Sequence, residues 1–193
     1  MFKVKLDRVL PYSKKLLQFS LSEGDVAIDA TVGNGHDTIF LSQLVGKTGH
    51  VYGFDIQQEA INNTQMLLKE KGRDDNVSLI LDSHSNAFNY IDDKHEGYIK
   101  GAVFNLGYLP GGDKTIVTVA DSTVSAIEQI FHMMASGGII VIVVYHGHPE
   151  GKLEKDHLIQ YVSSLDQKQA SVLQYRFLNQ VNDPPFIIAI EKK

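Results

Sequence analysis

Five short apolar runs recur along the chain, separated by longer amphipathic stretches. The runs are residues 26–29, 51–55, 77–81, 102–105 and 139–144. Val, Ile or Phe is prominent in each, which is typical of strands buried on both faces of a parallel sheet. Apolar residues recur at helical spacing within 37–45, 58–71, 122–134 and 152–165. The alternation predicts right-handed βαβ units and therefore an α/β fold.

The end of the chain has a different pattern. Residues 171–177 and 185–191 are predicted strands, and the loop between them, rich in Asn, Asp and Pro, holds no helix. A connection this short cannot join parallel neighbours, so we expect the two strands to pair antiparallel. We predict a single domain over 1–193. Its sheet is Rossmann-like, seven-stranded and mostly parallel, with an antiparallel C-terminal strand and helices on both faces.

The composition restricts the class of protein further. With no cysteine among its 193 residues, the chain has neither disulfides nor a cysteine-ligated zinc site. The longest apolar run, 139–145, is far too short to cross a bilayer, and residues 1–15 lack the apolar core of a signal peptide. We expect a cytoplasmic protein.

Charge is distributed unevenly along the chain. The net charge of −5 argues against a protein that coats nucleic acid nonspecifically. Residues 1–20 nevertheless carry five basic side chains and one acidic side chain, a local net charge of +4. This segment is either the solvated face of a helix or a patch that contacts phosphates, with Lys14 and Lys15 as the candidate residues.

The strongest motif is the turn Gly33-Asn34-Gly35, between the first apolar run and the helix predicted from Asp37. Glycines here allow a ligand to approach the backbone closely at the carboxyl end of the sheet. A dinucleotide site has a third glycine where this chain has Thr38. Asp29 and Asp37 flank the turn and disfavour a phosphate, but they suit S-adenosylmethionine, which is cationic. Asp37 can also serve as a helix cap.

Acidic residues end the next two predicted strands. Asp55 lies 22 residues after the first glycine of the turn, where a carboxylate can accept both hydroxyls of a ribose. Gln57 can reach the ribose or the adenine. The third strand leads into Asp82, Ser83 and His84, which we expect beside the adenine ring. The alternatives are a solvated Asp55 and a loop histidine without function.

The fourth predicted strand ends at Asn105, which faces the reacting group in amino-methyltransferases of this fold. Asn105 and Tyr108 match the ends of an Asn-Pro-Pro-Tyr motif, in which oxygens hold an amine while the ring stacks on a base; Leu106 and Gly107 replace the prolines. Methyl transfer is an in-line displacement, so an oriented, neutral amine needs no strong base. Asp113 can bind or deprotonate a cationic amine, or belong to a solvated turn.

His146 and His148 follow the fifth predicted strand. Two histidines are too few for a tight metal site, and no third ligand is apparent, so we predict no metal. We expect both at the rim of the site, where either can contact the substrate.

Four stretches together resemble a known family. They are Asp29-Ala-Thr-Val-Gly-Asn-Gly-His-Asp-Thr38, Asn105-Leu-Gly-Tyr-Leu-Pro-Gly-Gly-Asp-Lys114, Tyr145-His-Gly-His-Pro-Glu-Gly151 and Pro184-Pro-Phe-Ile-Ile-Ala-Ile-Glu191. The family comprises small bacterial methyltransferases long labelled "putative rRNA methylase". Its members look like the tRNA wobble-uridine enzymes that convert 5-aminomethyl-2-thiouridine into 5-methylaminomethyl-2-thiouridine.

This resemblance covers nearly the whole chain. It implies a class I methyltransferase fold that uses S-adenosylmethionine, a tRNA anticodon stem-loop as substrate, and a homodimer. It also implies a cofactor site of Asn34, Asp37, Asp55, Gln57, Ser83 and His84, and a site for the modified base of Asn105, Tyr108 and Asp113.

Other functions stay open at this point. An rRNA or a small amine metabolite is an alternative methyl acceptor, and the latter would not need the basic N-terminal segment. A noncatalytic nucleotide-binding module and an NAD-dependent enzyme are further alternatives. Thr38 in place of the third glycine argues against NAD.

Overall fold

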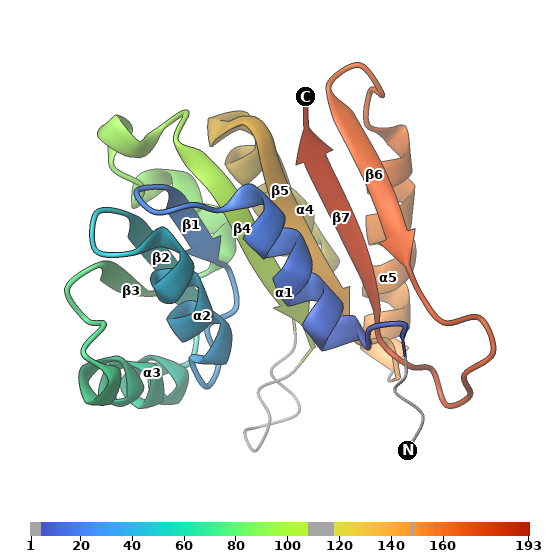
Figure 1. Ribbon diagram of the computed structural model, residues 1–193. Coiled ribbons are helices and arrows are strands. Elements are labelled where there is room, and N and C mark those ends of the chain that lie inside the picture. Colours follow the sequence, from blue (N-terminus) through green and yellow to red (C-terminus); the bar gives the residue numbers. More distant parts are fainter. Residues whose placement is uncertain (1–4, 108–117, 148) are drawn as a thin grey trace.

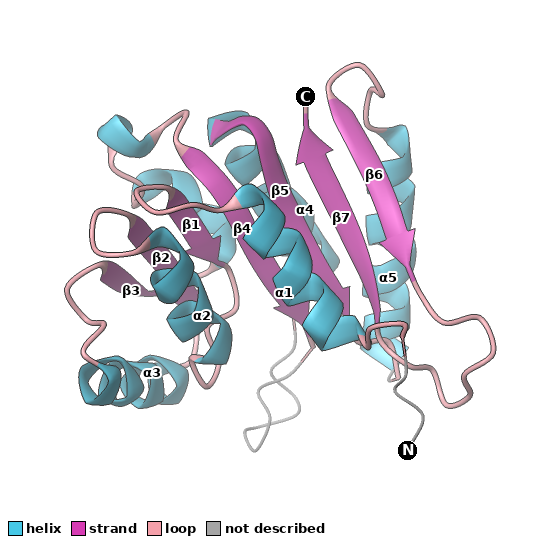
Figure 2. Ribbon diagram, viewed as in Figure 1, coloured by secondary structure: helices cyan, strands magenta, loops and turns pink. Residues whose placement is uncertain are grey.

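The protein is built on one seven-stranded sheet. The computed structural model describes residues 5–107, 118–147 and 149–193. The strands are β1 (Val26–Asp29), β2 (His50–Asp55), β3 (Val77–Leu81), β4 (Ile99–Leu106), β5 (Met134–Val144), β6 (Ala170–Tyr175) and β7 (Phe186–Lys192). Their order is β3-β2-β1-β4-β5-β7-β6 (Figure 2). β7 pairs antiparallel with β5 and with β6, whereas β1 to β5 pair parallel. The predicted fold class is confirmed.

Helices cover both faces of this sheet. They are α1 (Val9–Ser20), α2 (His36–Val45), α3 (Gln58–Lys71), α4 (Ala120–Met133) and α5 (Pro149–Ser164). Helices α1 and α2 lie on one face, and α4 and α5 on the other (Figure 1). Two 3₁₀ turns, η1 (His84–Asn89) and η2 (Asp93–His95), follow β3. The sequence did not predict them, because one or two short turns carry no hydrophobic period.

Two apolar cores, one on each face, explain why the strand sequences are apolar almost throughout. In β1 and β4, Ala27 and Val103 face the core beneath α1 and α2, while Ile28 and Phe104 face the core beneath α4 and α5. A strand buried on both faces has no position for a solvated side chain. Even the last residue of β1, Asp29, is buried.

The order of the strands determines where a ligand can bind. The chain runs outward from β1 through β2 to β3, and then returns to place β4 on the other side of β1. In open α/β sheets, ligands bind at the carboxyl ends of the strands on either side of such a switch point. The candidate residues after β1, β2, β3 and β4 therefore lie along one edge.

The N-terminal helix is fastened to the far side of the sheet. The Tyr12 ring stacks on Tyr175 with ring centroids 4.1 Å apart, and the Tyr175 hydroxyl donates to the Asp7 carbonyl at 2.8 Å. These contacts hold the start of α1 against the end of β6. Within the described ranges, no helix is long and apolar enough to cross a membrane.

Candidate active site

The backbone of the glycine turn has a conformation that glycine adopts more readily than other residues. Gly33 and Gly35 have φ angles of 52° and 78°, in the left-handed region that favours glycine. A Cβ on Gly35 would lie 2.7 Å from Thr64 Oγ1 of α3, so a larger residue does not fit. Gly35 also occupies the N-cap position of α2. The cap is therefore glycine, and Asp37, in the first turn, has another partner.

Asp29 and Thr38 hold this turn from beneath. Both are 0% exposed, and the Thr38 hydroxyl donates to Asp29 Oδ2 at 2.6 Å. The Thr31 N–H donates to the other carboxylate oxygen at 3.2 Å. Burial raises the pKa of Asp29 to about 7, with a further increase from Asp37. The role that these contacts support is to fasten α2 to β1, and direct contact of either side chain with a cofactor stays a prediction.

Asp55, the predicted ribose ligand, is held at the end of β2 by two backbone N–H groups. Its Oδ2 accepts from the Gly33 N–H and its Oδ1 from the Gln57 N–H, both at 2.9 Å. Each carboxylate oxygen has a further lone pair, so the pair of oxygens fits two neighbouring hydroxyls. Ile56, between the two predicted ligands, is 56% exposed and offers an apolar surface to a flat base. Ile56 was not predicted from the sequence, although its position beside Asp55 was a usable signal.

Asp82 and Ser83 are engaged with their neighbours. Asp82 accepts from the Tyr90 hydroxyl at 2.7 Å and from the Asn86 amide, and these bonds, Tyr90 first, hold its pKa below the usual value. The Ser83 hydroxyl accepts from the Ser85 N–H and caps η1. Both residues shape the segment after β3, and their contact with adenine stays a prediction.

His84 is packed inside the protein and is not a solvated loop residue. It is 8% exposed, and its ring meets Phe104 edge-on with centroids 5.6 Å apart. Nδ1 lies 3.0 Å from the Ala30 carbonyl, which can only accept, so Nδ1 carries the proton. Burial lowers the pKa of the imidazole. Nε2 is then a buried acceptor, with no partner among the described residues.

Asn105, the predicted residue of the substrate side, is held by two hydrogen bonds at the end of β4. Its backbone N–H donates to Thr31 Oγ1 at 2.7 Å, and its side-chain Nδ2 donates to Asp37 Oδ2 at 2.8 Å. Lys14 Nζ, from α1, lies 3.6 Å from Asp37 Oδ1. The three side chains come from α1, α2 and β4, so the sequence could not show that they meet. Thr31 was missed for the same reason.

The remaining substrate candidates are placed only in part. The ring of His146 packs beside Phe186, with centroids 5.3 Å apart, and Lys15 pairs with Asp7 at 2.6 Å. Tyr108, Asp113 and His148 lie outside the described residues. In the described ranges, no group of three His, Asp or Glu side chains could hold a metal ion.

Tyr145, after β5, is an additional residue of this edge. Its N–H donates to the Leu106 carbonyl, so it lies beside the end of β4. Burial raises the pKa of its phenol, and the Asp37 carboxylate adds to the increase. The sequence analysis gave Tyr145 no role of its own, because an aromatic residue at a strand end is common.

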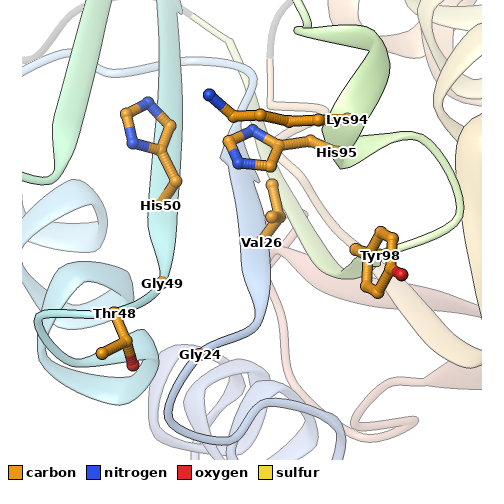
Figure 3. A pocket seen from close by; sticks show the side chains of 8 residues that line it. All are labelled: Gly24, Val26, Thr48, Gly49, His50, Lys94, His95 and Tyr98. Atoms are coloured by element: carbon orange, nitrogen blue, oxygen red, sulfur yellow. The ribbon is translucent and has the colours of Figure 1, made fainter.

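A cavity of about 290 Å³ lies at the opposite edge of the sheet, where the parallel strands begin (Figure 3). It is lined at the starts of β1 and β2 and by the segment around η2. The His50 and His95 rings stack there at 5.5 Å, and Lys94 pairs with Asp92 at 2.8 Å. This cavity lies at the starts of the strands and the glycine turn lies at their ends, so a substitution in the cavity leaves the residues around the turn unchanged.

Comparisons with known proteins find relatives that match most of the chain. The family described as "Putative rRNA methylase" matches residues 51–191. A chloroplast enzyme of Arabidopsis thaliana, named tRNA (mnm(5)s(2)U34)-methyltransferase, is 34% identical over 184 residues; the match covers 90% of this chain and 65% of that enzyme. The chain thus spans slightly less than two thirds of this relative.

Two solved structures have nearly the same fold. A Clostridium thermocellum protein with the family's name superposes with a TM-score of 0.94 at 40% identity, over 98% of this chain and 100% of the other. A Streptococcus mutans protein, solved in complex with SAH, gives 0.88 at 40% identity over 97% and 99%.

Proposed function

Because this chain belongs to the "Putative rRNA methylase" family, we propose that it is an S-adenosylmethionine-dependent methyltransferase that methylates the primary amine of 5-aminomethyl-2-thiouridine at the tRNA wobble position. The observation that carries the proposal is the fixed amide of Asn105, on the same sheet edge as Asp55 and the glycine turn. The name of the chloroplast relative supports a tRNA substrate. The Streptococcus mutans complex supports the cofactor.

The described residues fit this cofactor. The Asp55 carboxylate would hold the two ribose hydroxyls, and exposed Ile56 would cover one face of the adenine. The turn Gly33-Asn34-Gly35 leaves backbone accessible for the methionine part. When bound, S-adenosylmethionine supplies a methyl group on a positively charged sulfur, which an amine lone pair displaces in line.

Asn105 gives the acceptor amine its orientation. A side-chain oxygen accepts one N–H of the amine and so directs the nitrogen lone pair. The acceptor is uncharged, so it does not favour the protonated, non-nucleophilic form of the amine as a bare carboxylate would. The nitrogen gains a positive charge as the C–N bond forms, and it returns to neutrality when it releases a proton to water.

The partners of the proposed reaction are a tRNA anticodon stem-loop and a second copy of the chain. A single stem-loop requires few phosphate contacts. The basic residues of the N-terminal segment could supply them although the net charge of the chain is −5. In a homodimer, two such segments would be available. Light scattering of the purified protein tests the dimer, and a monomeric mass would contradict it.

Nucleoside mass spectrometry of RNA from cells that lack the gene tests the function. We expect 5-aminomethyl-2-thiouridine to accumulate in tRNA and its methylated form to disappear. The family description favours rRNA as the second candidate. An unchanged tRNA profile together with a methylation missing from rRNA would replace the first candidate with the second.

A further inference from the structure

The Asn105 side chain can offer its amide oxygen to a substrate only if its neighbours favour one of the two orientations of the amide. An asparagine amide can rotate by half a turn, which would exchange the acceptor Oδ1 with the donor Nδ2. In this protein, Nδ2 donates to the Asp37 carboxylate at 2.8 Å. A rotated amide would bring Oδ1 against that carboxylate, with two acceptors and no proton between them. Asp37 therefore selects one orientation.

Asp37 is itself held from its other side. Lys14 Nζ lies 3.6 Å from Asp37 Oδ1 and 5.0 Å from the centre of the Phe40 ring. The Lys14 side chain, which comes from α1, is therefore held by two residues of α2. The Asp37 and Lys14 side chains are 20% and 39% exposed, which leaves their charges partly shielded from solvent. The carboxylate thus lies between an ammonium group and an amide.

The order of these three groups has a chemical consequence. A carboxylate next to the acceptor amine would raise the pKa of the amine and keep it protonated. Here the group that faces the amine is neutral, and the carboxylate behind it is balanced by Lys14. We propose that Asp37 and Lys14 are positioning residues, which hold Asn105 so that Oδ1 accepts from the substrate amine. The inference rests on the proposed function.

This arrangement assigns Lys14 to the site. Its ammonium group contacts Asp37, so its main contribution is to the orientation of Asn105 and not to RNA phosphates. A lysine that binds phosphates would affect KM for RNA and its salt dependence. A positioning lysine affects kcat.

A double-mutant cycle in the full-length protein tests the role of Asp37. If Asp37 acts through Asn105, Asp37→Ala lowers kcat about 10- to 100-fold, and Asp37→Ala with Asn105→Ala is no slower than Asn105→Ala alone. Asp37→Asn, which still offers an oxygen to Nδ2, restores most of kcat. If the losses of kcat in the two alanine variants multiply in the double variant, the proposal is overturned. So would loss of SAH affinity in Asp37→Ala, measured by calorimetry, since that would make Asp37 a cofactor ligand.

Lys14→Met is compared with Lys94→Met, which removes a more exposed Lys–Asp pair at the opposite edge. We expect Lys14→Met to lower kcat with little change in KM, and Lys94→Met to change neither. A raised KM at unchanged kcat in Lys14→Met would instead identify a phosphate contact and overturn the role of Lys14.

A measurement without RNA separates this proposal from the proposed function. The Asn105 Nδ2 protons give side-chain amide signals in ¹⁵N NMR spectra. In Asp37→Ala we expect these signals to shift and to exchange faster with water, whereas unchanged signals would overturn the positioning role. Failure of the wild-type protein to methylate tRNA would contradict the proposed function, and the NMR result would still decide the positioning role.

Discussion

At Asp29, a carboxylate lies inside the protein and is stabilised by the Thr38 hydroxyl and the Thr31 N–H. Its pKa of about 7 means that much of it is protonated near neutral pH. In the protonated form the carboxyl can donate as well as accept, so the turn above it can be held in either form. A residue buried this deeply influences the site through the backbone it anchors.

The stability of the protein should therefore depend on pH through Asp29. The unfolded chain releases this proton near pH 3.8 and the folded chain near 7. Between these values the folded state binds more protons, so the free energy of unfolding falls as pH rises, by up to about 1.4 kcal/mol per pH unit. Urea unfolding should show a larger loss for wild type than for Asp29→Asn over this range. Parallel pH profiles would contradict the raised pKa.

Asp55→Ala should abolish most cofactor affinity. It removes the charged acceptor for two hydroxyls, and hydrogen bonds to charged groups contribute about 1.5–3 kcal/mol each. We expect SAH to bind at least about 10-fold more weakly by calorimetry. Asp55→Asn, which keeps one oxygen for the backbone, should be intermediate. Unchanged affinity in the alanine variant would remove Asp55 from the site.

At the scale of elements, the glycine turn links α2 to its neighbour α3. Gly35 has a left-handed backbone, and a side chain there would collide with Thr64. Gly72, at the C-cap of α3, has a similar φ of 60°, but a methyl group added there would have nothing within 4 Å. Substitutions at the two glycines therefore distinguish the free-energy cost of a left-handed backbone from the cost of a steric collision.

Gly35→Ala should cost more stability than Gly72→Ala. The second change adds only left-handed strain, about 1–2 kcal/mol. The first adds that strain and a collision at 2.7 Å, which must displace the Thr64 side chain of α3. Urea unfolding of both variants measures the difference. Equal losses would show that the Thr64 side chain moves away freely.

The seven strands and four of the helices could be predicted from the sequence because buried strands and amphipathic helices have distinct periods. The first half of β5 could not be predicted, because its residues 135–138 are Ala, Ser, Gly and Gly and do not resemble a strand. The strand begins at Met134 because this residue pairs with Ile99 of β4. The same limit applies to the site. The spacing made Asp55 a candidate, whereas the bond between Asp37 and Asn105 joins residues 68 apart in sequence and could not be predicted.

Over the whole molecule, the acidic excess and the basic N-terminus are connected by ion pairs. The net charge of +4 over residues 1–20 already counts Asp7, the partner of Lys15, and the contact of Lys14 with Asp37 of α2 offsets one further positive charge. An RNA substrate would then meet a smaller local positive charge than the basic residues alone suggest. We expect a shallow dependence of RNA affinity on salt, equivalent to about two to four phosphate contacts by fluorescence anisotropy. A slope above about six contacts would indicate an extensive RNA surface.

Reconstitution in vitro is the decisive test of methyl transfer to the wobble aminomethyl group. Purified protein and S-adenosylmethionine are incubated with tRNA from cells that lack the gene, and nucleosides are analysed by mass spectrometry. We expect 5-aminomethyl-2-thiouridine to gain one methyl group in wild type, and turnover to fall sharply in Asn105→Ala while SAH affinity is kept. Unmethylated tRNA with wild-type protein, or full activity in Asn105→Ala, would contradict the account.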